Sequence, residues 1–137
     1  MLKLVRDEKL ADRFMIDSAG TGAYHVGERA DPRSREEAES RGVPLPSIAR
    51  QFEEDDFDRF DYVIAMDRQN QRNLRTLARS EEDRAKVRLL RSFGPDGGEL
   101  DVPDPYHGGA KGFAQVFDIC DAGCRALLVH VRESRGW

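Results

Sequence analysis

The predicted fold rests on the stretch DYVIAMDRQNQRNLRTLARSEEDRAKVRLL (residues 61–90). It begins with a buried strand over 61–66, continues with a polar helix over 70–79 and ends with another apolar strand over 86–90. A parallel pair of strands needs a crossover of a dozen or more residues, which is usually helical. The stretch therefore predicts an α/β protein with an open parallel sheet flanked by helices.

Periodicity and capping signals extend this pattern in both directions. Helical spacing of apolar residues predicts a helix over 2–11, and a short buried strand follows at 14–16. Asp31 is a predicted N-cap, and Gly42 ends the helix that it begins. The last helix begins near Gly112 and carries a continuous apolar stripe. The stripe consists of Phe113, Val116, Phe117, Cys120, Cys124, Leu127, Leu128 and Val131.

Composition limits the classes of protein to which the chain can belong. Its 137 residues predict a single domain, 1–137, that is large enough for a core of its own. The 26 acidic and 22 basic residues are spread along the chain and give a net charge of -4, which disfavours nucleic acid as a partner. No apolar run reaches the ~18 residues of a membrane span, and two cysteines make no disulfide framework. These features predict a cytoplasmic protein with no membrane partner.

Three motifs follow one another along the chain: IDSAGTG (16–22), VIAMD (63–67) and VPDPYHGG (102–109). Together they resemble the low-molecular-weight protein tyrosine phosphatases, and the resemblance runs from about residue 2 to the last helix. It implies a hydrolase that removes phosphate from phosphotyrosine in protein substrates through a cysteinyl-phosphate intermediate. The same resemblance implies no metal and no organic cofactor.

One part of the family pattern is not in this sequence. The family opens with a strand and a phosphate loop that reads Cys, five residues, Arg, then Ser or Thr, whereas Met1 resembles a position inside the next helix. The resemblance therefore implies an N-terminally truncated chain whose sheet lacks its first, central strand, and which is inactive as it stands. Cys120 and Cys124 do not replace the nucleophile, because Ala126 and His130 occupy the positions of the required Arg.

Asp104 matches the general acid of the family. An acid must protonate the leaving oxygen when phosphorus is attacked, and the resulting carboxylate then activates water as a base. Pro103 and Pro105 flank Asp104 and restrict its backbone, which suits a proton donor held at a defined angle. Asp-Pro is also a common start of a turn, and it is the family match that favours the catalytic role.

Aromatic residues match the walls of the family's substrate cleft. Tyr106 and His107 follow the acid, although the second position is usually Tyr in the family. Tyr24 matches a second aromatic wall of the family's cleft. A surface histidine in a loop is the simpler interpretation of His107.

Ser18 and Asp67 match positions that support the family's phosphate loop by hydrogen bonding. The alternative for both is ordinary capping and turn formation at the ends of strands. Both follow a predicted strand, and ligands of open α/β sheets bind at the carboxyl ends of strands. Ser47 departs from the pattern, because many members have His there.

Other interpretations remain open at this point. An arsenate reductase uses the same fold but needs further redox cysteines, whereas Cys120 and Cys124 lie on an apolar stripe. A non-catalytic relic of the fold, or a start codon assigned too far downstream, also fits the sequence.

The acidic run at 53–56 lacks the ligand spacing of a calcium loop and predicts a solvated helix start. The oligomeric state and the physiological substrate are not predicted.

Overall fold

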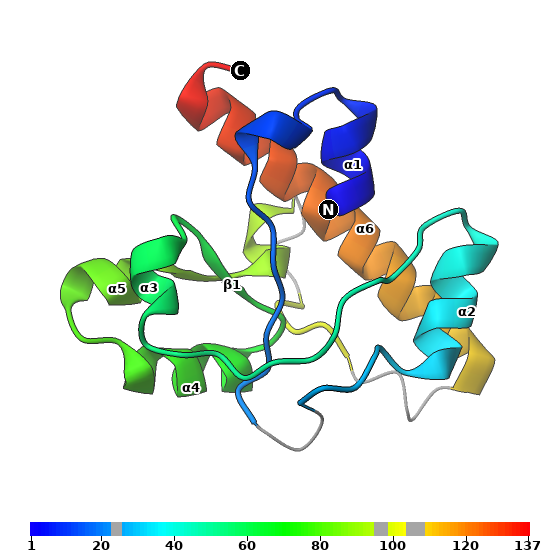
Figure 1. Cartoon of the computed structure of the whole chain (residues 1–137), viewed down its shortest axis with the longest axis horizontal. Coiled ribbons are helices and arrows are strands. Elements are labelled where there is room, and N and C mark those ends of the chain that lie inside the picture. The colour runs from blue at the N-terminus through cyan, green and yellow to red at the C-terminus, as the bar shows by residue number, and fades with distance from the viewer. Residues whose placement is uncertain (23–25, 95–98, 104–108) are drawn as a thin grey trace.

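The computed structural model describes residues 1–22, 26–94, 99–103 and 109–137. A small sheet with the short helices α3, α4 and α5 forms one side of the molecule, and the long helix α6 crosses the other with α1 and α2 beside it (Figure 1). In chain order the elements are α1 (Leu2–Asp7), η1 (Ala11–Arg13), α2 (Pro32–Ser40), α3 (Asp56–Arg59), β1 (Val63–Ala65), α4 (Arg68–Leu77), α5 (Glu81–Lys86), β2 (Val87–Leu89), η2 (Leu90–Phe93) and α6 (Gly109–Arg135).

The sheet consists of β1 and β2, which pair in parallel with Val63 opposite Val87 and Ala65 opposite Leu89. These four side chains are buried in one cluster with residues of α3 and α4. Ile64 points to the other face and packs on the cluster around α6. Because both faces are covered, the strands are apolar throughout their buried positions, as parallel strands usually are. The predicted α/β class with a parallel sheet is confirmed.

The connection between the strands holds two helices where the sequence predicted one. Ser80 caps α5 by accepting the Asp83 N–H at 3.1 Å, and the Asp83 carboxylate accepts the Arg79 N–H at 3.0 Å. This reciprocal arrangement resembles a capping box. A serine followed three residues later by an acid was the available signal, and the polar helix pattern before it obscured the break.

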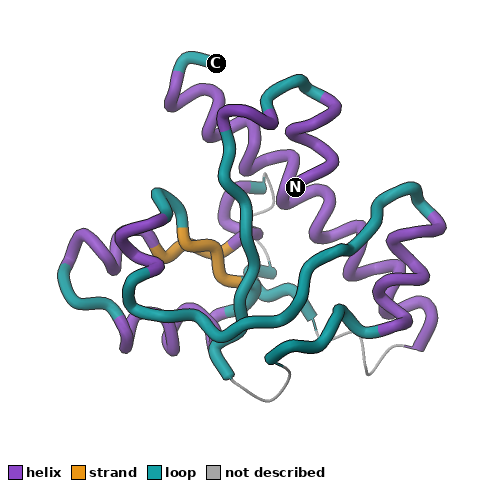
Figure 2. The backbone as a smooth tube through the Cα atoms, viewed as in Figure 1, coloured by secondary structure: helices purple, strands orange, loops and turns teal. Residues whose placement is uncertain are grey.

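The strand predicted at 14–16 does not form. The segment is extended, but among the described residues no backbone hydrogen bond joins it to β1, and Figure 2 draws it as loop. Phe14 and Ile16 pack against the cluster of α1 and α6, while Met15 between them is 66% exposed. The alternation of a strand is therefore present without a ladder, because side-chain packing alone holds the segment in place.

The predicted helix after Asp31 is confirmed as α2. The Asp31 carboxylate accepts the Arg33 N–H at 2.8 Å, and Pro32 takes the first helical position, where no N–H is needed. Gly42 follows the helix with φ of +74°, a conformation that favours glycine. These local signals are sufficient because each acts within a few residues.

Helix α6 buries both ends of its predicted stripe: Phe113 near its start, and Leu127, Leu128 and Val131 near its end, are all below 9% exposure. It approaches η2 closely at Gly123. A Cβ placed on Gly123 would lie 2.7 Å from Cγ of Leu90, a side chain that is 2% exposed. The contact between α6 and the sheet layer therefore requires a residue without a side chain at this position.

We expect Gly123→Ala to destabilise the protein by about 1 kcal/mol, although alanine favours a helix by about 1 kcal/mol over glycine. Overpacking a buried site costs about 1–3 kcal/mol and outweighs that gain. In a Leu90→Ala background the clash is removed, so the same substitution should be stabilising. Urea unfolding of the four proteins of this cycle measures the effect, and equal changes in both backgrounds would contradict the close contact.

Candidate functional site

The carboxyl end of β1 leads directly into the start of α4 through Met66 and Asp67. Asp67 is the N-cap of α4, and its Oδ1 accepts the Asn70 N–H at 2.7 Å. Its Oδ2 accepts no hydrogen bond from any other residue in the described ranges. The capping interpretation of Asp67 is therefore correct, and the side chain keeps one oxygen for a further donor.

Residues 99–103 are anchored across this same edge of the sheet. The Val102 N–H donates to the Met66 carbonyl at 2.9 Å. Asp101 accepts three hydrogen bonds from Arg68, from its N–H at 2.9 Å and from Nε and Nη2 at 3.1 and 3.2 Å. Arg91 donates to the Asp101 carbonyl at 2.8 Å. The base of the segment that continues into residue 104 is thus fixed at the end of β1.

Electrostatics favour this anchor at neutral pH. The hydrogen bonds from the Arg68 side chain and N–H lower the pKa of Asp101, so the carboxylate stays charged. Sequence reasoning missed both residues. Arg68 and Asp101 are 33 positions apart, and no local spacing signals a bidentate pair of this kind.

Ser18 lies in a second segment, residues 17–20, which we call the arm. Hydrogen bonds to residues 50–52 hold this arm in place. The Ser18 N–H donates to Asp17 at 2.8 Å, and the other oxygen of Asp17 accepts from Nε of Arg50 at 3.0 Å. Backbone hydrogen bonds of 2.8 Å join Gly20 to the Arg50 carbonyl and to the Phe52 N–H. Ser18 itself is exposed, and among the described residues no hydrogen bond joins it to Asp67.

The acidic run at 53–56 is not a solvated helix start throughout, because Asp56 is fully buried. Its carboxylate accepts both terminal nitrogens of Arg50, at 2.9 and 3.2 Å, together with Nη1 of Arg59 and the Glu53 N–H, each at 2.8 Å. Burial alone raises the pKa of a carboxyl group, but the bonds from Arg50 and Glu53 outweigh it and lower the pKa of Asp56. The prediction failed because the two arginines that pair with Asp56 lie outside the run, on either side of it.

Arg50 therefore connects the arm that carries Ser18 to a charge in the protein interior. Its guanidinium bonds Asp56 on one side and Asp17 on the other. A buried carboxylate with four donors has a defined geometry, and the arginine that it holds is defined in turn. The position of the arm thus depends on the Asp56 cluster.

Several predicted site residues lie outside the described residues. Asp104, Tyr106 and His107 belong to one such segment and Tyr24 to another, so their roles stay predictions. Cys120 and Cys124 are described and are half-buried on α6.

Comparisons with known proteins identify the family. The family model for low molecular weight phosphotyrosine protein phosphatase matches residues 1–136. The chain belongs to this family. A low molecular weight protein-tyrosine-phosphatase of Streptomyces coelicolor is 48% identical over 131 residues, which are 94% of this chain and 80% of the relative. The Gallus gallus enzyme of the family is 39% identical over a region that covers 92% of this chain and 80% of the length of that enzyme.

Solved structures show the same phosphatase fold. A protein tyrosine phosphatase from Entamoeba histolytica, crystallised with Hepes in its active site, superimposes with a TM-score of 0.91 at 36% identity. The match covers 98% of this chain and 85% of that one. In the part of this chain that the structure describes, no helix has the length and apolarity needed to cross a bilayer.

We expect Asp56→Asn to lower the free energy of unfolding by about 3 kcal/mol at pH 7, because it removes the buried charge with which Arg50 and Arg59 pair. The lowered pKa gives this contribution a defined pH dependence. It is complete above the unfolded pKa of about 4 and is lost as the pH falls through the lower folded value. The difference between wild type and variant should therefore shrink below pH 4.

The matched control is Asp118→Asn, which breaks an exposed ion pair with Arg41 by the same chemical change. Its effect should be small at all pH values. Denaturant unfolding between pH 3 and pH 7 checks both proteins. A stability difference for Asp56→Asn that is constant over this range would contradict a lowered pKa.

Proposed function

We propose that the chain carries the acid and the supporting residues of a phosphatase that hydrolyses phosphotyrosine in proteins. In this proposal a cysteine thiolate attacks the phosphorus, Asp104 protonates the phenol, and the Asp104 carboxylate then activates the water that releases phosphate. Family membership supports the class of reaction, and no metal or organic cofactor is invoked.

The anchor at the carboxyl end of β1 is the observation that carries the proposal. Val102 is bonded to Met66, and Asp101 is bonded to Arg68, so the segment before Asp104 begins at a fixed place. Ligands of open α/β sheets bind at this edge. General acid catalysis requires a proton donor within hydrogen-bond reach of the leaving oxygen. Because the start of the segment is fixed, fewer conformations have to be sampled before Asp104 reaches that position.

The remaining site residues have supporting roles in the proposal. Tyr24, Tyr106 and His107 would form the walls against which the substrate ring stacks. Asp67 has an oxygen available for a donor of the phosphate loop, and Ser18 is exposed on the arm held by Arg50. A cytoplasmic location is also proposed, since two free cysteines are usual in a reducing compartment.

The nucleophile is not among the 137 residues. The two cysteines of the chain are half-buried on α6, and burial raises the pKa of Cys120 to about 11, the reverse of nucleophile activation. Their half-buried positions also argue against the arsenate reductase alternative, which needs accessible redox thiols. We therefore propose that the 137-residue polypeptide has no phosphatase activity by itself.

The purified 137-residue chain should not hydrolyse an aryl phosphate. Loss of a covalent nucleophile and its oxyanion donors removes on the order of 10⁶ of the rate enhancement. Release of the phenol at enzyme concentrations of ordinary assays measures the rate. Turnover that disappears in a Cys120→Ser or Cys124→Ser variant would refute the proposal and identify the nucleophile.

A version that carries the family's strand and Cys-x5-Arg loop ahead of residue 1 tests Asp104. We expect Asp104→Asn to lower kcat roughly 10²–10⁴-fold for substrates with poor leaving groups and far less for acidic phenols, which leave without a proton. Asp118→Asn is the control on an exposed carboxylate. Equal slowing of both classes of substrate would rule out Asp104 as the acid.

A further inference from the structure

Helix α4 carries a stripe of arginines on its outer face. Arg68, Arg72 and Arg75 follow one another at spacings of four and three residues, which place them on one side of the helix. Leu74 and Leu77 lie on the opposite side, and both pack in the cluster around the sheet. This packing turns the three arginines towards solvent, and all three are exposed. We call these three residues the arginine stripe.

The stripe begins at the edge of the sheet where the proposed site lies. Arg68 directly follows Asp67, the N-cap at the carboxyl end of β1, and α4 lies at the surface beside that strand (Figure 1). A helix rises about 1.5 Å per residue, so Arg75 lies about 10 Å further along the axis. An extended peptide rises about 3.3 Å per residue, and about three of its residues therefore span the stripe.

Carboxylates neutralise the arginines at both ends of α4. Arg68 bonds Asp101 at 3.1 Å beside the start of the helix. Arg79 follows the C-cap and bonds Asp58 at 2.7 Å and Asp83 at 2.9 Å. These pairs connect α4 to neighbouring segments and leave little positive charge for another molecule.

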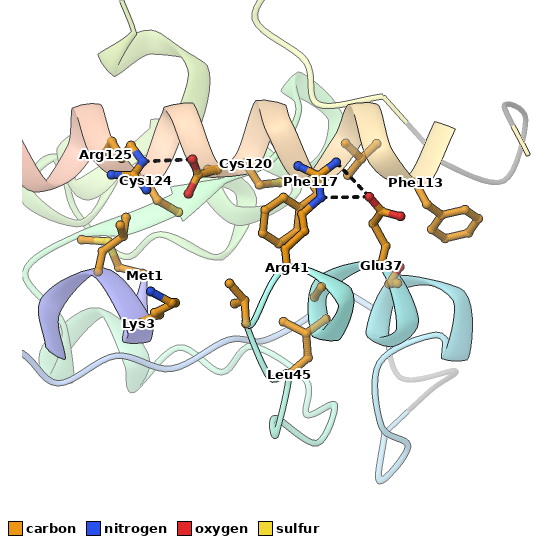
Figure 3. Close-up of a pocket in the computed structure, with 16 residues that line it drawn as sticks. Met1, Lys3, Glu37, Arg41, Leu45, Phe113, Phe117, Cys120, Cys124 and Arg125 are labelled. Carbon is orange, nitrogen blue, oxygen red and sulfur yellow. Dashed lines mark hydrogen bonds and ion pairs between the residues drawn. The ribbon is translucent and has the colours of Figure 1, made fainter. Parts of the chain in front are cut away.

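Arginines of the same kind line the groove between α1, α2 and α6. Arg41 binds Glu37 at 2.8 Å, and Arg125 binds Asp121 at 2.9 Å (Figure 3). The groove therefore has cations whose charge is already compensated by carboxylates on the same helix or at its end.

The middle of the stripe lacks this compensation. No acidic residue occurs in α4, whose sequence is RQNQRNLRTL. Arg72 donates to the uncharged Gln69 side chain at 2.7 Å, and in the part of the chain that is described neither Arg72 nor Arg75 has a carboxylate within ion-pair distance. Both guanidinium groups can therefore bind an anion from another molecule.

The stripe also lies close to the segment that leads to residue 104. The hydrogen bonds from Arg68 are the main cause of the lowered pKa of Asp101, and the positive charge of Arg72 lowers this pKa further. Arg72 is thus within electrostatic range of the anchor at the carboxyl end of β1. A peptide bound at that edge would pass near the stripe.

We propose that Arg72 and Arg75 bind acidic residues that flank the phosphotyrosine of a protein substrate. This inference rests on the proposed function, because the phosphotyrosine itself would occupy the site at the carboxyl end of β1. Carboxylates suit the stripe, since a guanidinium group binds them through two nitrogen atoms. The net charge of -4 disfavours a nucleic acid as the occupant.

The test uses the version of the chain that carries the family's strand and Cys-x5-Arg loop ahead of residue 1. Two phosphotyrosine peptides of equal length are compared, one with aspartates on both sides of the phosphotyrosine and one with asparagines in their place. We expect kcat/KM to be about tenfold higher for the acidic peptide, because each exposed ion pair contributes a factor of about 1.5–5. The preference should decrease in 1 M salt, which screens such pairs beyond about 3 Å.

The double variant Arg72→Gln/Arg75→Gln should lose this preference. The loss should appear in KM, because contacts remote from the reacting atoms stabilise the bound substrate and the transition state equally. The control Arg6→Gln/Arg125→Gln removes the same number of charges from α1 and α6 and should retain the preference. Amide spectra verify the fold of each variant.

Charge reversal at a single position gives an independent measurement. Arg75→Glu should favour a peptide with lysines in place of the aspartates, whereas a merely structural role of Arg75 would slow hydrolysis of all peptides alike. Absence of a preference in the wild type, or a preference that survives the double substitution, would overturn the proposal.

Hydrolysis of an aryl phosphate, which has no flanking residues, tests the proposed function separately. If the aryl phosphate is hydrolysed and the acidic peptide is not preferred, only the inference about the stripe fails. If neither is hydrolysed, the proposed function fails, and NMR of the arginine Nε–H groups tests the stripe by binding alone. The acidic peptide should then shift the resonances of Arg72 and Arg75. Equal shifts with the asparagine peptide, or with a single-stranded oligonucleotide of the same charge, would refute recognition of acidic peptides.

Discussion

The parallel pairing of β1 with β2 is the interaction on which the rest of the structure depends. The two strands have only three residues each, so their stability comes from the layers that cover both faces. Val63 and Val87 bury one face against α3 and α4, and Ile64 meets the cluster of α6 on the other. Because the ladder fixes where β1 ends, it also fixes Asp67 and the start of α4.

The candidate site is built from two anchors that differ in burial. The Arg68–Asp101 pair is largely exposed and joins the start of α4 to the segment before residue 104. The Arg50–Asp56 pair reaches a fully buried carboxylate and holds the arm of Ser18 through Asp17. In both cases an arginine fixes one segment of the chain against another, because its planar guanidinium group binds a carboxylate through two nitrogen atoms.

Helix α6 has different surroundings along its length. Its C-terminal part is core, with Gly123 in close contact with Leu90 and with Leu127 buried beside it. Phe113 near its start is also buried, whereas Phe117 and the two cysteines in the middle of the helix are only half-buried. One continuous sequence pattern thus serves two environments, and the difference arises from what packs opposite it.

The sequence by itself determined the features that act over a few residues. The strands of the βαβ unit, the cap of α2 at Asp31 and the apolar stripe of α6 all follow from local periodicity and capping, and the three motifs identified the family. Only the tertiary structure decided that Asp56 is buried and that Asp101 meets Arg68. The Arg68–Asp101 pair joins residues 33 positions apart, and Arg50 and Arg59 lie on either side of the acidic run that contains Asp56. Neither composition nor helical spacing encodes which arginine each of these carboxylates meets.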